Sequence, residues 1–207
     1  MGSLIMHIAI TEKFRKKYNL SYKFLVGALL PDIYDKMDMS RNETHYIDNQ
    51  GPELPNFTKF VETNKSKLLA KDEIMLGYFC HIISDKVWYN LFLTKYIKDL
   101  RVGQTTVTYL EDESEHPIEE FWKTIYEDYD QIDRWICEKY KINIEELRLN
   151  IINYIDRVDV KNKLLEILYE RDFDPKRKNC FITNKDVKQY IDVALNEVEL
   201  ILAKYLI

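Results

Sequence analysis

Residues 77–92, GYFCHIISDKVWYNLF, give the most direct prediction of how this chain folds. Hydrophobic side chains point in almost every direction around a helix drawn through them, which is typical of a helix enclosed by other helices. His81 and Asp85 lie four residues apart within it, so both side chains leave the same stripe of the helix. A buried carboxylate needs a partner, because an unpaired charge in an apolar interior is costly. The sequence therefore predicts a central helix that presents a His and an Asp to one common partner.

Other helical patterns surround this central segment. Ser3, Asn56 and Asp72 are suitable helix N-caps, and Pro117 suits a first helical turn. The chain of 207 residues has only five Gly and five Pro, which favours helices over turn-rich β structure. We expect an all-α, single-domain, multi-helix bundle. The central helix should run from Asp72 past residue 90 toward residue 98, and the other expected helices cover about 4–18, 21–30, 57–69, 117–140, 144–156, 160–171 and 184–207.

Three segments are predicted to be irregular. Residues 31–55 are polar and rich in Asp, Asn, Pro and Gly, and a loop of this length in a compact domain is usually functional or disordered. Residues 101–109, RVGQTTVTY, have the β-branched character of a short extended connection. Residues 175–180 form a basic patch that we interpret as a loop between helices.

Composition excludes several classes of protein. The formal charge is −5, and Lys and Arg are nowhere concentrated among aromatic residues, which disfavours a nucleic-acid-binding surface. Cys80, Cys137 and Cys180 are odd in number and far apart, which favours reduced thiols. No run of about 18 uncharged apolar residues is present to span a membrane, and residues 1–14 lack a basic leader and a small-residue cleavage site. We therefore expect a cytoplasmic protein, with no prediction of its oligomeric state.

The polar residues of the first 85 positions include a mixture of His and Asp in apolar or special surroundings. His7 lies within LIMHIAI, Asp32 follows Pro31 after an apolar segment, and His45 lies in the polar loop. Together with His81 and Asp85, these side chains suit zinc or another divalent transition metal such as manganese or iron. Spacing alone also allows a simpler interpretation, in which the central pair is only a hydrogen bond across one helical turn.

The order of these residues adds a family resemblance. H-I-A at residues 7–9, G-x-x-x-P-D at 27–32, T-H at 44–45 and G-Y-x-x-H-x-x-x-D-x-x-W at 77–88 resemble the zinc-dependent phospholipase C family. That family shares its all-α fold with the single-strand-specific mould nucleases. The resemblance implies a cluster of one or two metal ions held between helices, which hydrolyses phosphate esters with metal-activated water.

Transferred to this chain, the resemblance assigns the metal ligands and a catalytic residue. Asp32, His45, His81 and Asp85 would hold one ion. Asp85 would bridge to a second ion that His7 also binds, and it is the residue expected to be essential for catalysis. A bridging carboxylate suits two ions a few ångströms apart, which together can activate water and stabilise the leaving oxygen.

The chain also departs from the family pattern. Phospholipases C of this type begin with a tryptophan whose amino group binds metal, whereas six residues precede His7 here, and the next expected histidine after Asp85 is missing. Asp130 and Asp133 resemble an acidic segment of small cytoplasmic relatives, so we predict them as further ligands. A second candidate replacement for the missing metal ligands is the H-x-x-x-E pair formed by His116 and Glu120. For both pairs, a solvated acidic helix face is the competing interpretation.

Three functions follow as hypotheses. The first is a metal-dependent hydrolase of a small phosphate ester, a phosphodiester or phosphomonoester, with Lys23, Arg41 and Lys86 as candidate anion contacts. The second is a catalytically degenerate relative in which the metal, or only the polar cluster, is a structural clamp in a binding protein. The third is an HD-type metal phosphohydrolase, which ranks lower because no adjacent His-Asp dipeptide occurs. Trp88, Trp122 and Trp135 lie on apolar faces and are predicted to be core residues.

Overall fold

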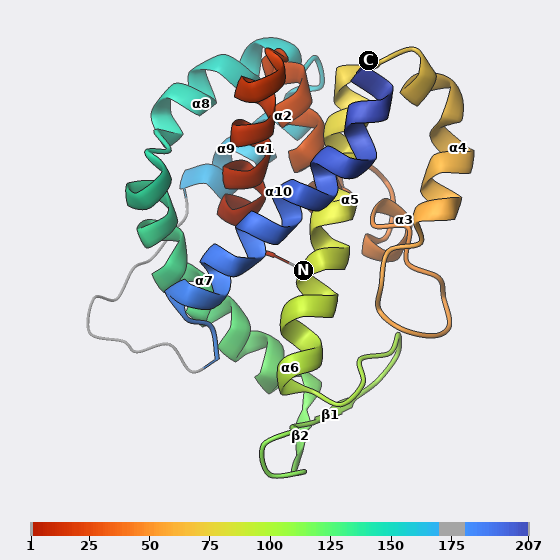
Figure 1. Cartoon of the computed structure of the whole chain (residues 1–207), viewed down its shortest axis with the longest axis vertical. Helices are drawn as coiled ribbons and strands as arrows, with labels where there is room; N and C mark the ends of the chain where they lie inside the picture. The colour runs from red at the N-terminus through yellow and green to blue at the C-terminus, as the bar shows by residue number, and fades with distance from the viewer. Residues whose placement is uncertain (1, 170–180, 207) are drawn as a thin grey trace.

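The central helix forms as expected and is labelled α5, Glu73–Trp88. The computed structural model describes residues 2–169 and 181–206, and helices make up most of this part of the chain (Figure 1). The all-α prediction is confirmed, with one small hairpin added. The other α-helices are α1 (Leu4–Tyr18), α2 (Tyr22–Leu29), α3 (Arg41–Thr44), α4 (Phe57–Leu69), α6 (Thr94–Tyr96), α7 (Ile118–Tyr140), α8 (Ile144–Ile151), α9 (Val158–Tyr169) and α10 (Asn184–Leu206).

Side-chain caps explain where the well-predicted helices begin. The hydroxyl of Ser3 accepts a hydrogen bond from the backbone N–H of Met6, at the start of α1. The carboxylate of Asp72 accepts from the N–H groups of Ile74 and Met75, at the start of α5. These bonds satisfy donors that the first turn of a helix leaves without partners. The predicted N-caps at Ser3 and Asp72 are therefore confirmed.

The contact between α2 and α5 is unusually close because each helix has a glycine at the crossing. A Cβ atom on Gly77 would lie 1.8 Å from the carbonyl oxygen of Phe24, and a Cβ on Gly27 would lie 1.9 Å from that of Ile74. No side chain larger than hydrogen fits at either position. The two backbones therefore touch directly, one helical turn before His81.

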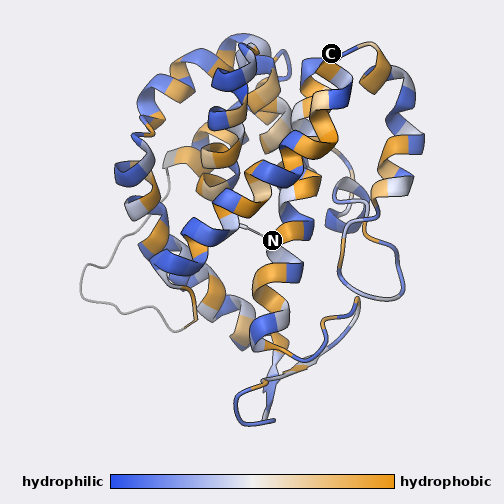
Figure 2. Cartoon of the chain, viewed as in Figure 1, coloured by the Kyte–Doolittle hydropathy of each residue, from blue (hydrophilic) through white to orange (hydrophobic). Residues whose placement is uncertain are grey.

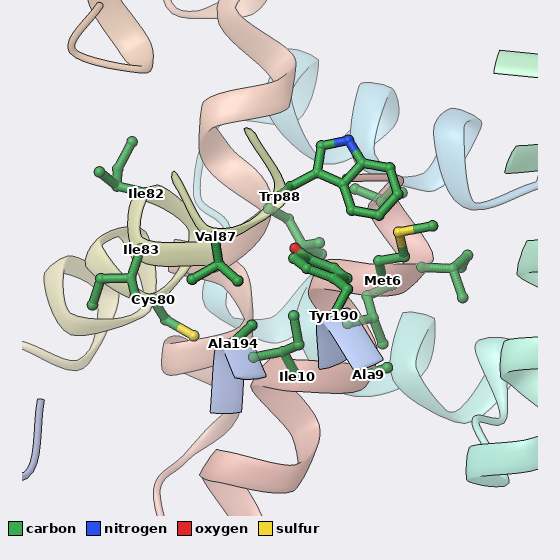
Figure 3. Close-up of a cluster of buried hydrophobic side chains, with 14 of the residues drawn as sticks. Met6, Ala9, Ile10, Cys80, Ile82, Ile83, Val87, Trp88, Tyr190 and Ala194 are labelled. Carbon is green, nitrogen blue, oxygen red and sulfur yellow. The ribbon is translucent and has the colours of Figure 1, made fainter. Parts of the chain in front are cut away.

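A single hydrophobic core lies where α1, α2, α5, α7 and α10 meet. In Figure 2, hydrophobic and hydrophilic residues alternate along α7 and α10, whereas the central helix α5 is buried along most of its length. Figure 3 shows part of the core, in which Trp88 and Tyr190 pack with Met6 of α1 and Ala194 of α10. The predicted core position of Trp88 is confirmed, because its side chain is 0% exposed and its ring stacks on Phe92.

Several boundaries differ from the prediction. Residues 31–55 are less irregular than expected, because a 3₁₀ helix, η1 (Leu30–Lys36), continues from α2, and the short helix α3 follows with a capping box between Ser40 and Glu43. The central helix passes into a π-helical turn, η2 (Tyr89–Leu93), and then into α6, so the helical path ends at residue 96. The helix predicted over 144–156 stops at Ile151 and is followed by a 3₁₀ turn, η3 (Ile152–Tyr154).

The predicted extended connection is part of a small hairpin. Strand β1 (Thr106–Thr108) pairs antiparallel with β2 (Glu115–Pro117), and Val107 lies opposite His116. Cys80 and Cys137 are free thiols. The basic loop predicted at residues 175–180, Cys180, and the last two residues of the helix predicted over 160–171 lie outside the described residues.

Candidate metal centre

The five His and Asp residues singled out in the first 85 positions lie together in the structure. They come from four different elements: His7 from α1, Asp32 from η1, His45 from the end of α3, and His81 and Asp85 from α5. The three imidazole rings and the Asp85 side chain are fully buried, whereas the Asp32 side chain is 21% exposed. The site is therefore enclosed by helices and opens to solvent through Asp32.

His7, His81 and Asp85 form the first of two groups whose ligand atoms could hold a metal ion. The Nε2 atom of His7 lies 3.2 Å from Oδ1 of Asp85, and the Nε2 atom of His81 lies 3.2 Å from Oδ2 of the same carboxylate. The rings of His7 and His81 stack with their centroids 3.9 Å apart. Asp85 thus has one histidine nitrogen next to each of its oxygens.

Asp32, His45 and His81 form the second group. The Nε2 atoms of His45 and His81 are 3.3 Å apart, and Oδ1 of Asp32 lies 3.5 Å from the first and 3.8 Å from the second. Asp85 is also close, with Oδ2 3.7 Å from Nε2 of His45. Because His81 belongs to both groups, the two candidate positions for an ion are adjacent.

Backbone carbonyls determine which nitrogen of each central histidine faces the site. The Nδ1 atom of His81 lies 2.8 Å from the carbonyl oxygen of Ala28, and Nδ1 of His45 lies 3.0 Å from that of Arg41. A carbonyl can only accept, so Nδ1 of His81 donates its proton to Ala28. Nδ1 of His45 can donate to Arg41 in the same way, and it also lies 3.0 Å from the hydroxyl oxygen of Thr44. In the neutral rings, both Nε2 lone pairs then point at each other across 3.3 Å. A proton or a cation between them removes that repulsion, and ligating histidines commonly have this second hydrogen bond.

Other polar atoms of the centre lack hydrogen-bond partners. Within the described residues, both ring nitrogens of His7 and Oδ2 of Asp85 are buried without a hydrogen bond of normal geometry, although His7 and His81 each approach Asp85 to 3.2 Å. Buried polar atoms are almost always paired in proteins, and an exception calls for an unseen water or ion. Nitrogen and carboxylate oxygen are ligands that zinc, manganese and iron all accept. The residues present therefore fit a divalent transition metal.

The charges of the centre shift the pKa values of its members. Burial alone would raise the pKa of Asp85, but His81 and His7 hold it well below its usual range. Burial likewise opposes ionisation of Asp32, whose pKa is nevertheless lowered to about 2 by His81, His45 and His7. Burial would lower the pKa of His81, but Asp85 and Asp32 raise it. The pKa of His7 is lowered by burial and by the neighbouring His81. The two carboxylates thus stay ionised and favour positive charge between them.

A cleft of about 330 Å³ adjoins the exposed edge of this centre. Its lining combines Asp32 with residues of α1, α3, α7 and α9. Only one cationic side chain, that of Arg41, is present among the described residues that line it. The lining residues are Gly2, Ser3, Leu4, Asp32, Arg41, Trp122, Tyr126, Tyr129, Asp130 and Ile167.

The remaining predicted ligands lie outside both groups. Asp130 lines the cleft, whereas Asp133 is buried and accepts a hydrogen bond from the hydroxyl of Ser3. Their role as ligands stays a prediction. His116 stacks on Tyr109 in the hairpin, and its Nε2 lies 2.7 Å from the hydroxyl oxygen of Ser114. It also belongs to neither group found in the described part of the chain.

Sequence reasoning missed several residues around the centre. The backbone N–H of Gly2 donates to Oδ1 of Asp85 over 3.3 Å, and a Cβ on Gly2 would lie 2.9 Å from the hydroxyl of Tyr190. No local pattern marks these residues. Trp122, predicted as core, is partly buried against the core and also lines the cleft. Arg41 was recognisable as a candidate anion contact, but its carbonyl bond to His45 follows only from the helical turn between them.

None of the helices in the described residues combines the length and the apolar character needed to cross a membrane.

The chain was also compared with known proteins, because relatives could explain this centre. The phospholipase C resemblance rests on short motifs within residues 7–88. The comparison found no match to any model of a protein family, to any curated protein or to any solved structure.

Proposed function

We propose that this protein is a metal-dependent hydrolase of phosphate esters, with one or two ions of zinc, manganese or iron at the centre. When bound, such ions activate water and stabilise negative charge on phosphate oxygens. In the overall reaction, water supplies the new oxygen on phosphorus, the bond between phosphorus and the organic oxygen breaks, and that oxygen takes a proton. The phospholipase C resemblance is the reason for choosing this chemistry among those that metals support.

The observation that best supports a metal is the pair of facing histidine nitrogens. Nε2 of His45 and Nε2 of His81 are 3.3 Å apart, and each Nδ1 lies next to a backbone carbonyl, so two neutral rings would present both Nε2 lone pairs to the same point. Carboxylate oxygens of Asp32 and Asp85 lie within 3.8 Å of these nitrogens. Two lone pairs and two carboxylates around one point favour a dication there.

In this proposal, each residue of the chain has a defined role. Asp85 would bridge two positions, because its two oxygens face different histidines. Its pKa, held low by His81 and His7, keeps it ionised at neutral pH. Asp32 would join the centre to the cleft, because it is the only one of the five that is partly exposed. The cleft would admit the substrate at that edge.

A structural clamp is the second candidate. The group formed by His7, His81 and Asp85 is almost completely excluded from solvent, since these residues are 0–2% exposed. An ion there would join α1 to α5 without meeting a substrate. This enclosure favours a stabilising role for at least that half of the centre.

Metal content and hydrolysis together distinguish these functions. The purified protein would be stripped with a chelator, repleted with zinc or manganese, and analysed for bound metal. Hydrolysis would be measured on glycerol 2-phosphate and on bis(4-nitrophenyl) phosphate. We expect one or two ions per chain, with both metal and hydrolysis reduced at least about 10-fold by Asp85→Asn. Asp192→Asn is the matched control, because Asp192 is an exposed aspartate on α10 that pairs with Lys188.

Each outcome has a clear meaning. If no stoichiometric metal remains after repletion, the proposed function is wrong. Bound metal without hydrolysis that depends on Asp85 would instead favour the clamp. Equal losses in Asp85→Asn and Asp192→Asn would show that the assay reports general damage to the protein.

A further inference from the structure

The cleft beside Asp32 has a chemical character of its own, which the metal centre does not explain. From α7, three aromatic residues line it together with Asp130: Trp122, Tyr126 and Tyr129. The lining also includes Asp32 of the centre and Arg41. An aromatic surface and an anion-binding cation thus line the same small space, next to the candidate metal ligands.

The aromatic wall follows from the spacing of residues on α7. Trp122 and Tyr126 are one turn apart, and their rings stack with centroids 6.1 Å apart and planes inclined by 29°. Tyr129 continues the row, with its ring edge-on to that of Tyr126 at 6.0 Å. The Tyr126 side chain is 56% exposed, although it is a large aromatic residue beside a cleft. Such rings offer faces on which a planar ring of a ligand can stack.

Among the described residues that line the cleft, carboxylates outnumber cations, so these residues favour an anion only once a metal is bound. Asp32 and Asp130 contribute two carboxylates, whereas Arg41 is the single cation among the described lining residues. Glu53 already accepts from Nη1 of Arg41, and no other hydrogen bond of this guanidinium is present in the described part of the chain. The remaining guanidinium N–H groups are suited to a phosphoryl oxygen. Without bound metal, the carboxylates would repel a phosphate group.

The size of the cleft also restricts the ligand. A volume of about 330 Å³ is at the small end of the range for ligand pockets, which is about 300–1,000 Å³. A phosphate group and one compact ring system suit such a space better than a long, flexible chain does. The walls, charges and size therefore favour the same kind of molecule.

We propose that this cleft is the substrate subsite and that it selects phosphate esters whose organic group is an aromatic ring. The ring stacks on Tyr126 and Trp122, and the phosphoryl group lies between Arg41 and the metal centre at Asp32. This inference rests on the proposed function for its phosphate chemistry, but the aromatic selection rests on α7 alone.

Two phosphonates test the aromatic selection without any catalysis. Phenylphosphonate and methylphosphonate share the same anionic group, and their phosphorus–carbon bond resists hydrolysis. Their dissociation constants would be measured by titration calorimetry on the zinc-repleted protein and on the metal-free protein. We expect phenylphosphonate to bind the repleted protein about tenfold more tightly, a difference of about 1.4 kcal/mol. Neither should bind the metal-free protein.

Variants assign this preference to particular residues. Tyr126→Ala should abolish the tenfold preference while leaving the affinity for methylphosphonate unchanged, and Tyr126→Phe should restore it. Because the Tyr126 side chain is 56% exposed, its truncation should not prevent folding. Tyr154→Ala is the matched control, since Tyr154 is a 37% exposed tyrosine that does not line the cleft. Arg41→Gln should weaken both phosphonates equally.

The outcomes separate this inference from the proposed function. Equal affinities of the repleted wild type for the two phosphonates would overturn the aromatic selection, as would a preference that survives Tyr126→Ala. Hydrolysis of glycerol 2-phosphate that depends on Asp85 would still support the proposed function in either case. If neither phosphonate binds while that hydrolysis is present, the subsite is not in this cleft.

Discussion

Replacing Gly77 with alanine should destabilise the fold and weaken the metal centre together. The added Cβ would lie 1.8 Å from the carbonyl oxygen of Phe24 and 3.1 Å from the backbone nitrogen of Ala28. Both atoms belong to the backbone of α2, so no side chain can rotate away to make room. The two helices would have to separate by roughly 1.6 Å to reach the 3.4 Å at which ordinary contact begins.

The expected loss in the free energy of unfolding follows from this separation of α2 and α5. A gap of only 0.5–1 Å already forfeits about a quarter to a half of the dispersion energy between packed atoms. Overpacking of a core usually costs about 1–3 kcal/mol, and a clash between two backbones belongs at or above the upper limit. We therefore expect a loss of about 3 kcal/mol. For a chain of this length, that corresponds to a fall of roughly 6–12 °C in the melting temperature.

The same movement should affect His81. Its Nδ1 atom donates to the carbonyl of Ala28 over 2.8 Å, and Ala28 lies beside the clash with Gly77. Displacing that carbonyl releases the ring from the orientation that points Nε2 into the site. Loss of such a supporting hydrogen bond typically lowers metal affinity by about 10- to 100-fold. Thermal melting, urea denaturation and zinc titration of the stripped protein measure the two effects separately.

Gly51→Ala is the matched control for this substitution. Gly51 has φ +101°, and a Cβ there would meet nothing within 4 Å. We expect only the backbone cost of about 1–2 kcal/mol, with unchanged zinc affinity. If Gly77→Ala melts within about 2 °C of the wild type, the close approach of α2 and α5 is wrong. If it is destabilised but binds zinc normally, the coupling through Ala28 is wrong.

Three further substitutions test other parts of the structure by urea denaturation. Tyr190→Phe removes a buried hydroxyl that makes no hydrogen bond of normal geometry within the described residues, so the free energy of unfolding should stay unchanged or rise by up to about 1 kcal/mol; a clear fall would reveal a partner. Ser3→Ala removes the cap of α1 and the donor to Asp133, which should cost about 2 kcal/mol; a loss below about 0.5 kcal/mol would contradict both bonds. Asp32 has a folded-state pKa of about 2 against 3.8, so its ionised form stabilises the metal-free protein above about pH 4 by about 2 kcal/mol. That stabilisation should be lost as the pH falls toward 2, and Asp32→Asn should make this part of the pH profile flatter.

Local features of the fold were predictable from the sequence because their causes are local. Ser3, Asn56 and Asp72 bond to backbone N–H groups two or three residues ahead, so the start of each helix depends on a short segment alone. The approach of His81 and Asp85 to each other likewise needs only one helical turn. For these features, the surrounding tertiary structure adds little.

Features that depend on how helices pair could not be predicted. Nothing in the sequence around Gly77 identifies α2 as the helix whose backbone packs against it. The hydrogen bond between His81 and the backbone carbonyl of Ala28 follows from that pairing. Because it involves the backbone, no residue type in the sequence indicates it. Short helical pieces such as η1 and α3 were missed in residues 31–55 for the same reason, since packing rather than propensity stabilises helices of a few residues.

The position of Trp122 shows a different limit of sequence patterns. Its spacing with Phe121 and Ile125 places it near the apolar face of α7, where the core and a cleft wall are both sheltered from bulk water. Phe121 is fully buried in the core, whereas Trp122 is partly exposed at the cleft. Hydrophobic periodicity gives the direction in which a side chain points, but it does not tell whether a neighbour fills the space there.

The two halves of the candidate metal centre differ in their access to solvent. His7 and Asp85 are sealed inside the bundle, whereas Asp32 reaches the cleft, and His81 belongs to both halves. An ion in the sealed half would satisfy Nε2 of His7, the nitrogen that faces Asp85, and hold α1 against α5, as a clamp does. An ion in the open half would meet a ligand from the cleft, as an enzyme requires. One centre can therefore serve both functions, and the number of ions bound decides between a clamp alone and a clamp that supports catalysis.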